Sequence, residues 1–211
     1  MSIVTISRGS FSRGKEVAEK VADCLGYRCV SRDLILRASK EFNVPELSLV
    51  KAVRDGPGFF DHFTHSKDRY ISYFQYALLK EFQKDDVVYH GFAGQFLAKG
   101  FHHVLKVRII ADWGDRLQLL MAREGIERAD AVRALRRLDE ERRKWSEGMY
   151  GLDVADPSLY DLVIHIHRLT VDEASDIICR TAKLDRFKTT PESQAELDQQ
   201  IFTSRQLVGD L

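Results

Sequence analysis

The chain has 211 residues, which suits one domain with one large core and makes two full domains improbable on size. Hydrophobic residues make up 44% of it and charged residues 30%, a composition that excludes wholesale disorder. Lys plus Arg equals Asp plus Glu at 32 each, so no overall positive field favours nucleic acid or an anionic membrane. We therefore expect any anion-binding site to be local.

The start of the chain and its cysteines both predict a cytoplasmic protein. The opening Met-Ser-Ile-Val-Thr-Ile-Ser-Arg reaches polar residues too soon for a signal peptide or a membrane helix, so no membrane partner is expected. Cys24, Cys29 and Cys179 are odd in number and lack CxxC spacing, which argues against a disulfide framework or a zinc knuckle. We expect these cysteines to be small core residues.

Strand and helix patterns alternate from the first residues onward. Residues 2–7 are a β-branched run, and apolar residues at helical spacing follow over 14–25. A second strand is expected at 27–30 and a second helix at 33–42. The stretch 44–65 mixes Pro, Gly and aromatic residues, so we expect short helix and loop there rather than a domain linker.

The same alternation continues through the second half and defines the fold class. The βαβα order predicts an α/β protein with a doubly wound, parallel, five-stranded sheet flanked by helices. The polar segment 185–211 is expected to be a peripheral helix or a loose tail outside the domain formed by residues 1–184. The further expected elements are helix 67–83, strands 86–90 and 104–110, helices 115–124 and 127–148, strand 162–166, and a helix to residue 182 that opens with a Thr170–Glu173 capping box.

A phosphate-binding loop is predicted between the first strand and the first helix. Residues 9–15 match GxxxxGK, and glycines in such a loop let backbone amides face a phosphate at a helix N-terminus. Lys15 can reach terminal phosphates, whereas Glu16 stands where a Ser or Thr would contact magnesium. An ordinary strand-to-helix turn is the alternative. The expected nucleotide-binding residues of this loop are Gly9, Ser10, Phe11, Ser12, Arg13, Gly14, Lys15 and Glu16.

Seven basic residues between 128 and 144 form a second candidate for phosphate contact. Helical spacing places Arg136, Arg142 and Arg143 around Asp139. Phosphoryl transfer depends on positioning and on stabilising charge that spreads over the phosphate oxygens, and arginine supplies permanent, bidentate positive charge. The alternative is a solvated helix with surface ion pairs. We expect Lys15, Arg136, Arg142, Arg143 and Asp139 to be catalytic. Asp139 would orient Arg142 or bind acceptor ribose.

Further short motifs occur in a consistent order along the chain. They are Ile6-Ser-Arg8, Gly14-Lys15-Glu16, Leu25-Gly-Tyr27, Val87-Val-Tyr-His-Gly-Phe-Ala-Gly94, Leu138-Asp-Glu-Glu-Arg142, Asp156-Pro157 and Tyr160-Asp-Leu-Val163.

Together these motifs resemble the cytidylate kinase-like family over roughly residues 3 to 183. The resemblance implies a P-loop NTPase fold, with the acceptor-side region at about 31–83 and a helical lid at about 127–150. It also implies ATP as phosphoryl donor, magnesium as cofactor, and transfer of the γ-phosphoryl group to a nucleoside monophosphate such as CMP or dCMP. The partners would then be a nucleotide and a small phosphorylated acceptor, bound by a monomer or a homodimer.

Several polar residues at strand ends are weaker candidates. Arg32 and Asp33 follow the second strand and would contact the acceptor, mostly by the resemblance, unless Ser31 simply caps a helix. Gly91 follows the third strand on the same acceptor side. Arg116 follows the fourth strand and would lie near the nucleotide base or begin the lid, unless it pairs with Asp112 or Asp115.

Two departures from the family pattern keep other functions open. Phe92 stands where the family commonly has an arginine, and His90 stands where many P-loop enzymes have an acidic residue. With Glu16, these residues favour a nucleotide-binding regulatory protein without turnover as the second hypothesis. A P-loop kinase of another small metabolite is the third. The metal ligands are unknown, and His102, His103, His165 and His167 are expected to be structural or surface residues.

Overall fold

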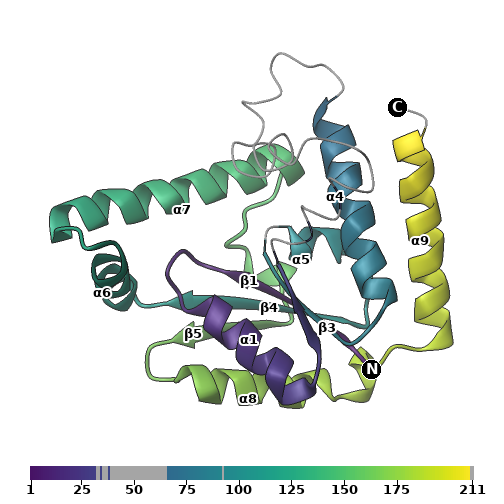
Figure 1. The fold of residues 1–211 in the computed structure, drawn as a ribbon, viewed down its shortest axis with the longest axis horizontal. Coiled ribbons are helices and arrows are strands. Elements are labelled where there is room, and N and C mark those ends of the chain that lie inside the picture. Colours follow the sequence, from purple (N-terminus) through teal and green to yellow (C-terminus); the bar gives the residue numbers. More distant parts are fainter. Residues whose placement is uncertain (32–33, 35–37, 39–65, 92, 210–211) are drawn as a thin grey trace.

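The structure is a computed structural model, and it describes residues 1–31, 34, 38, 66–91 and 93–209. Five parallel strands form one sheet in the order β2-β3-β1-β4-β5, with helices on both faces (Figure 1). This confirms the predicted doubly wound α/β sheet. The strands are β1 (Ile3–Arg8), β2 (Arg28–Val30), β3 (Val87–His90), β4 (Val104–Ala111) and β5 (Leu162–Ile166).

The helices agree closely with the sequence expectation within the described ranges. The long helix that follows α6 extends two residues beyond the predicted end, and the short α5 was not predicted. The expected helix at 33–42 and the segment 44–65 lie almost entirely outside the described residues. The helices are α1 (Gly14–Leu25), α4 (Ser66–Gln83), α5 (Gly94–Leu97), α6 (Trp113–Glu124), α7 (Arg128–Tyr150), α8 (Val171–Ala182) and α9 (Pro191–Gly209), with short 3-10 turns at Pro157–Leu159 and Asp185–Phe187.

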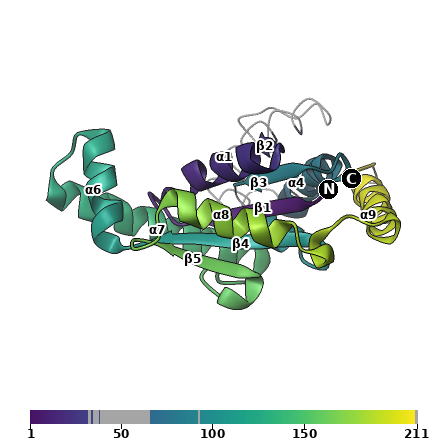
Figure 2. The ribbon, with the colours of Figure 1, turned by 90° about the horizontal axis from the view of Figure 1, so that it is seen from below.

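Alternate residues of the central strands bury into two separate cores. On β1, Ile3 packs with α4, α5 and α9, whereas Val4 and Ile6 pack with α1 and α8. Figure 2 shows α1 and α8 along one face of the sheet. Because side chains alternate across a strand, this arrangement fixes which face each strand residue serves. It also brings the carboxyl ends of β1 and β4 together at one edge, where Arg8 pairs in register with Ile109.

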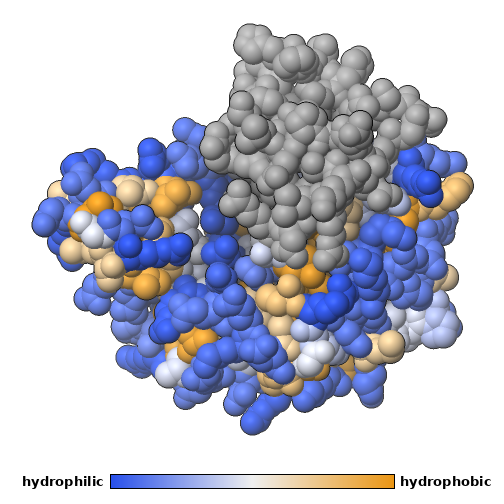
Figure 3. Space-filling model, viewed as in Figure 1, coloured by the Kyte–Doolittle hydropathy of each residue, from blue (hydrophilic) through white to orange (hydrophobic). Residues whose placement is uncertain are grey.

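The C-terminal segment is a helix that packs along α4. Leu197 and Ile201 of α9 are buried in the core that α4 supplies, and Gln83 donates a hydrogen bond to Asp198 at 2.7 Å. Figure 1 shows the two helices side by side. Hydrophilic residues cover most of the described face in Figure 3, with apolar residues in small areas. No described helix is long and apolar enough to cross a membrane.

The buried side chain of Leu197 should supply much of the free energy that holds α9 against α4. Leu197 is 1% exposed, so Leu197→Ala leaves a cavity against α4 and should lower the free energy of unfolding by about 2–5 kcal/mol. Phe202 on the same helix is 61% exposed, and Phe202→Ala should change it by less than about 1 kcal/mol. Urea unfolding of both variants checks this. Equal effects would show that α9 is not held through its buried face.

Candidate phosphate-binding site

The loop at residues 9–13 connects the end of β1 to the start of α1. It is anchored on β4, because the Gly9 amide donates to the Ile109 carbonyl at 3.0 Å. The Ser12 hydroxyl donates to the Gly9 carbonyl at 2.9 Å and closes the turn. Phe11 and Arg13 adopt left-handed backbone conformations, with φ of 56° and 59°. The loop thus has a fixed, tightly turned shape at the carboxyl edge of the sheet.

Gly14 is required by close packing at the first residue of α1. A Cβ at this position would lie 2.6 Å from the Arg8 Cβ and 3.3 Å from the Ile109 Cβ. These separations are far below van der Waals contact, and both neighbours are rigid strand residues. The glycine therefore lets the helix begin directly against the strand ends, a packing role that adds to the backbone turn predicted from the GxxxxGK pattern.

The charged residues of the loop face solvent and pair locally. Lys15 is exposed, with its Nζ 3.5 Å from a Glu19 carboxylate oxygen. Arg13 and Glu16 form an ion pair at 2.6 Å, so this carboxylate is already engaged. Ser10 is buried, and its hydroxyl has no hydrogen-bond partner within the described part of the chain. The Ser10 Oγ is thus a polar atom available inside the loop.

Arg116 joins the loop to the long helix α7. Its Nε donates to the Ser10 carbonyl at 2.7 Å, and one terminal nitrogen contacts both carboxylate oxygens of Asp139 at 2.6 and 2.8 Å. The two carboxylates that were the alternative partners predicted for Arg116 make other contacts. Asp112 caps α6 at the Gly114 amide, and Asp115 contacts His167. Arg116 therefore holds the loop and α7 in one geometry.

Arg142 lies deep among other arginines. Burial is the main cause that lowers the pKa of Arg142 to about 10, and Arg8, Arg108 and Arg116 lower it further while Asp139 opposes them. Burial also lowers the pKa of Arg8. At this value Arg142 stays protonated near neutral pH, so four positive guanidinium groups surround one close carboxylate. Such an excess of desolvated positive charge favours binding of an anion.

A cavity of about 260 Å³ opens between these groups. It places arginines from three elements beside the phosphate loop, at the carboxyl edge where parallel α/β sheets bind ligands. Its lining residues are Gly9, Arg108, Ile110, Ala111, Arg116, Asp139, Arg142, Arg143, Asp153, Val154 and Ala155.

Arg8 and Arg108 were missed by sequence reasoning. Arg108 donates to the Val154 carbonyl and, at 3.3 Å, to the Tyr160 hydroxyl, which holds the guanidinium against the wall of the cavity. The signal that could have found both residues is their position, since Arg8 ends β1 and Arg108 interrupts the apolar residues in the carboxyl half of β4. A charged residue inside a buried strand is costly unless it has a partner or a ligand.

The arginines predicted around Asp139 are only partly brought together. Arg142 and Asp139 line the cavity, and so does part of Arg143. The guanidinium of Arg143, however, contacts Glu140 at 2.8 Å and Glu147 at 2.7 Å on the exposed side of α7. Arg136 is exposed and does not line the cavity. Geometry thus favours Arg142 over Arg143 and Arg136 as the phosphate contact.

The acceptor-side candidates are mostly beyond the described residues. Arg32, Asp33 and Phe92 lie outside them, and their roles stay predictions. Gly91 follows β3, where a Cβ would lie 2.5 Å from the Tyr89 hydroxyl oxygen. The need for glycine at this position is therefore explained by the tyrosine beneath it, whether or not a ligand binds there.

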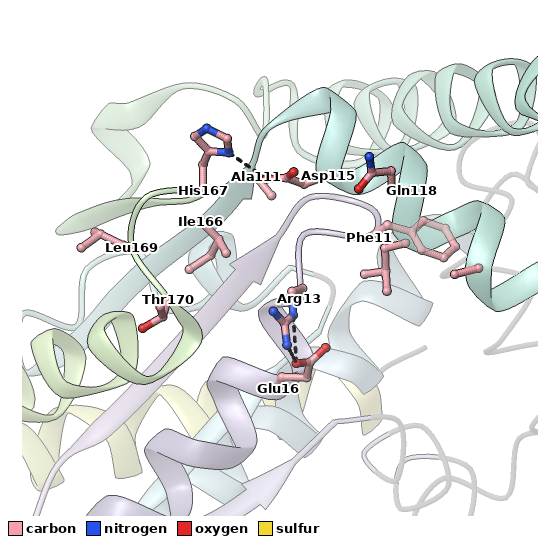
Figure 4. A pocket seen from close by; sticks show the side chains of 12 residues that line it. Phe11, Arg13, Glu16, Ala111, Asp115, Gln118, Ile166, His167, Leu169 and Thr170 are labelled. Atoms are coloured by element: carbon pink, nitrogen blue, oxygen red, sulfur yellow. Dashed lines mark hydrogen bonds and ion pairs between the residues drawn. The ribbon is translucent and has the colours of Figure 1, made fainter.

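A second cavity, of about 520 Å³, also borders the loop (Figure 4). Phe11, Arg13 and Glu16 line it from the loop, α6 lines it with Gln118, and residues after β5 complete it. It is more open and less charged than the arginine cavity, which suits a flat organic group better than a phosphate. Its remaining lining residues are Ala111, Asp115, Leu119, Ala122, Ile166, His167, Leu169 and Thr170.

His167 and Asp115 close one rim of this second cavity. The His167 Nδ1 lies 2.9 Å from an Asp115 carboxylate oxygen, and this hydrogen bond raises the pKa of His167. Asp112 is near enough that ligand atoms of all three residues fall within 4.8 Å of one another. This is the cluster of metal-ligand type found in the described ranges, and all three residues are exposed.

The parallel sheet, the anchored loop and the arginine cavity at the same edge define a P-loop kinase fold. The match to the cytidylate kinase-like family covers residues 3–168, and the chain belongs to this family. The resemblance drawn from the motifs is thereby confirmed, and the membership makes the chain a nucleotide kinase at the level of the family.

Individual relatives are distant. A cytidylate kinase of Sulfolobus acidocaldarius is 26% identical over 178 residues, which cover 83% of this chain and 91% of that protein. A cytidylate kinase of Methanopyrus kandleri is 32% identical over 104 residues, covering 46% of this chain and 54% of that one.

Solved structures agree on the fold. An uncharacterized protein from Eubacterium ventriosum superimposes with a TM-score of 0.63 at 19% identity, covering 86% of this chain and 98% of its own. A shikimate kinase from Bacteroides thetaiotaomicron gives 0.50 at 10% identity, covering 87% and 99%. At these identities the likeness concerns the fold alone.

The rim contact at His167 should be visible in its titration. Because Asp115 raises the pKa of His167 in the folded protein, the protonated pair stabilises the fold at low pH and this contribution is lost as pH rises through the folded pKa. NMR titration of the imidazole should give a pKa above about 6.5, and Asp115→Asn should lower it. An unchanged titration in Asp115→Asn would rule out the contact.

Proposed function

We propose that this protein transfers the γ-phosphoryl group of ATP to a nucleoside monophosphate, with CMP or dCMP as the first acceptors to test. Family membership and two relatives that are named cytidylate kinases support this substrate class. The observation that carries the proposal is the arginine cavity beside the phosphate loop. Its charge excess matches what a transferring phosphoryl group requires.

The loop and the arginine cavity suggest a division of roles. Amides of the loop and Lys15, after turning from Glu19, would hold the donor phosphates. Arg142 would meet the charge that develops on the transferred group, since it is desolvated and lies among the guanidinium groups of Arg8, Arg108 and Arg116. Arg116 would act as a positioning residue, because it holds the loop carbonyl and Asp139 at once.

The larger cavity would receive the base of the donor nucleotide. Both cavities border the loop and share Ala111 in their linings, so a nucleotide lying across the loop could reach both. Phe11 supplies an aromatic side chain and Gln118 an amide at its edge, as Figure 4 shows. These groups provide apolar contact and hydrogen bonding of the type that a base requires.

Magnesium would bind through the nucleotide phosphates rather than through a site built by the loop. The Ser12 hydroxyl donates to the Gly9 carbonyl, the Glu16 carboxylate pairs with Arg13, and Asp139 pairs with Arg116. These three oxygen-bearing side chains are therefore already engaged within the protein, whereas magnesium prefers oxygen ligands that are free to coordinate it.

A nucleotide-binding protein without turnover is the second candidate. The pairing of Lys15 with Glu19 and of Glu16 with Arg13 favours it, because both residues would have to change partners to serve catalysis. A coupled assay with ATP, magnesium and each ribonucleoside and deoxyribonucleoside monophosphate separates the candidates. Turnover that is fastest with CMP or dCMP supports the proposal. ATP binding without turnover on any acceptor would instead support the second candidate.

Arg142→Ala should depress turnover with the best acceptor by about 10²–10³-fold, or about 2.7–4 kcal/mol, by analogy with the loss of one oxyanion-stabilising donor. Nucleotide affinity should fall much less, because the contact strengthens in the transition state. Steady-state kinetics together with calorimetric ATP binding measure both quantities.

Arg137→Ala is the matched control on the same helix. Arg137 pairs with Glu141 on the exposed face, and such pairs are worth about 0–1 kcal/mol. Equal losses of turnover in the two variants would show that α7 acts through its overall charge or stability rather than through Arg142.

A further inference from the structure

Two cysteines from different helices meet between α1 and α8. Cys24 lies exposed in the last turn of α1, and Cys179 of α8 is buried against the same turn, where the Cys24 thiol contributes to raising the pKa of Cys179. The Cys179 sulfur also lies 3.9 Å from the carbonyl oxygen of Val21, one helical turn before Cys24. The two cysteines therefore occupy the same part of the contact between α1 and α8, although 154 residues separate them in sequence.

The two helices pack closely enough for a covalent link. Small side chains, Ala18 and Ala22 of α1 and Ala174 and Ala182 of α8, occupy the core that these helices share. An ion pair between Lys20, one turn before Cys24 on α1, and Asp172 at the start of α8 also joins the two helices. Figure 2 shows α1 and α8 side by side on the same face of the sheet. Small residues at a helix interface bring the backbones near, as a disulfide requires.

The two thiols differ in solvent exposure, and this difference determines which one reacts first with an oxidant. The sequence prediction that all three cysteines are core residues is wrong for Cys24 and Cys29, which are exposed, and holds for Cys179, which is buried. Burial and the adjacent Cys24 thiol raise the pKa of Cys179 to about 12. An oxidant from solvent therefore reaches Cys24 first, while Cys179 remains a buried, protonated thiol.

We propose that Cys24 and Cys179 form a reversible disulfide under oxidising conditions and so act as a redox-sensitive tether between α1 and α8. With a small disulfide such as oxidised glutathione, the Cys24 thiolate attacks one sulfur and releases one glutathione thiolate. Cys179 then gives its proton to solvent and its sulfur attacks Cys24, releasing the second glutathione thiolate. The two protein thiols lose two electrons, which the oxidant gains with two protons.

The first step makes the second easier. Part of the raised pKa of Cys179 comes from the hydrogen bond and the charge of Cys24. Once Cys24 is in a mixed disulfide it cannot carry a negative charge, so this contribution is lost and burial remains as the main cause that raises the pKa of Cys179. The buried cysteine is thus protected until its partner has reacted.

The tether would act on the two helices that border the larger cavity. The phosphate loop supplies Phe11 and Arg13 to the lining of that cavity and leads directly into α1. Thr170 also lines the cavity, and it caps the start of α8. A covalent link at the opposite ends of both helices restricts their separation. This inference does not rest on the proposed kinase activity, because the link and its effect on stability are measured without substrates.

Peptide mapping tests the link directly. The folded protein is incubated with oxidised glutathione, quenched with N-ethylmaleimide and digested with trypsin without reductant. Cleavage after Lys20, Arg28, Arg168 and Arg180 should give residues 21–28 joined to residues 169–180, two hydrogens lighter than the sum of the free peptides. Cys29→Ser should give the same pair, and Cys24→Ser should not. A folded protein that yields only a glutathione adduct, or a link to residues 29–32, would overturn the proposal.

Thermal unfolding supplies a second readout. A link that fits the native geometry restricts the unfolded chain, so the oxidised protein should have a Tm about 5–10 °C above that of the reduced protein. Reductant should reverse the shift, and Cys24→Ser should show none. A linked protein with an unchanged or lower Tm would contradict the inference that the two thiols already stand in bonding position.

Discussion

The site depends on one interaction above all, the bridge that Arg116 makes between the Ser10 carbonyl and the Asp139 carboxylate. The loop belongs to β1 and α1, whereas Asp139 belongs to α7. With this bridge in place, the arginine cavity has a closed wall at α6 and a carboxylate that faces Arg142. Phe11 of the loop also packs against the apolar residues that α6 and α7 share, but the Arg116 bridge is the polar link that joins the loop backbone to Asp139. The geometry available to a phosphate is thus set by a side chain that need not touch the reacting atoms.

The bridge leaves the rest of the cluster with too much positive charge. Burying guanidinium groups near one another costs stability, and one carboxylate cannot offset four of them. Natural sequences keep such an arrangement where a ligand supplies the missing negative charge. The zero net charge of the chain shows that this is a local feature and not a property of the whole surface. A local field at the sheet edge would also keep phosphates away from the remaining surface.

Sequence patterns predicted the sheet and most helices because period-two and helical patterns report burial directly. They also predicted the loop, since Gly14 must be glycine for the helix to begin against Arg8. They could not choose among the arginines of α7, because Arg142 and Arg143 are adjacent and only the path of α7 decides which one turns inward. Arg8 and Arg108 were missed for a similar reason. Their importance depends on strands that meet only after folding.

The left-handed backbone conformations of Phe11 and Arg13 connect the shape of the loop to the position of α7. Phe11 and Arg13 lack the freedom of glycine, and such conformations cost of order 1–3 kcal/mol each unless contacts hold them. The contacts that hold them are the Gly9 bond to β4 and the Arg116 bond to Ser10. Loop shape and the docking of α7 are therefore thermodynamically linked: whatever favours one favours the other by the same free energy. A ligand that needs the turned loop would draw α7 inward without touching it, and a loosened α7 would let the loop relax and release the ligand.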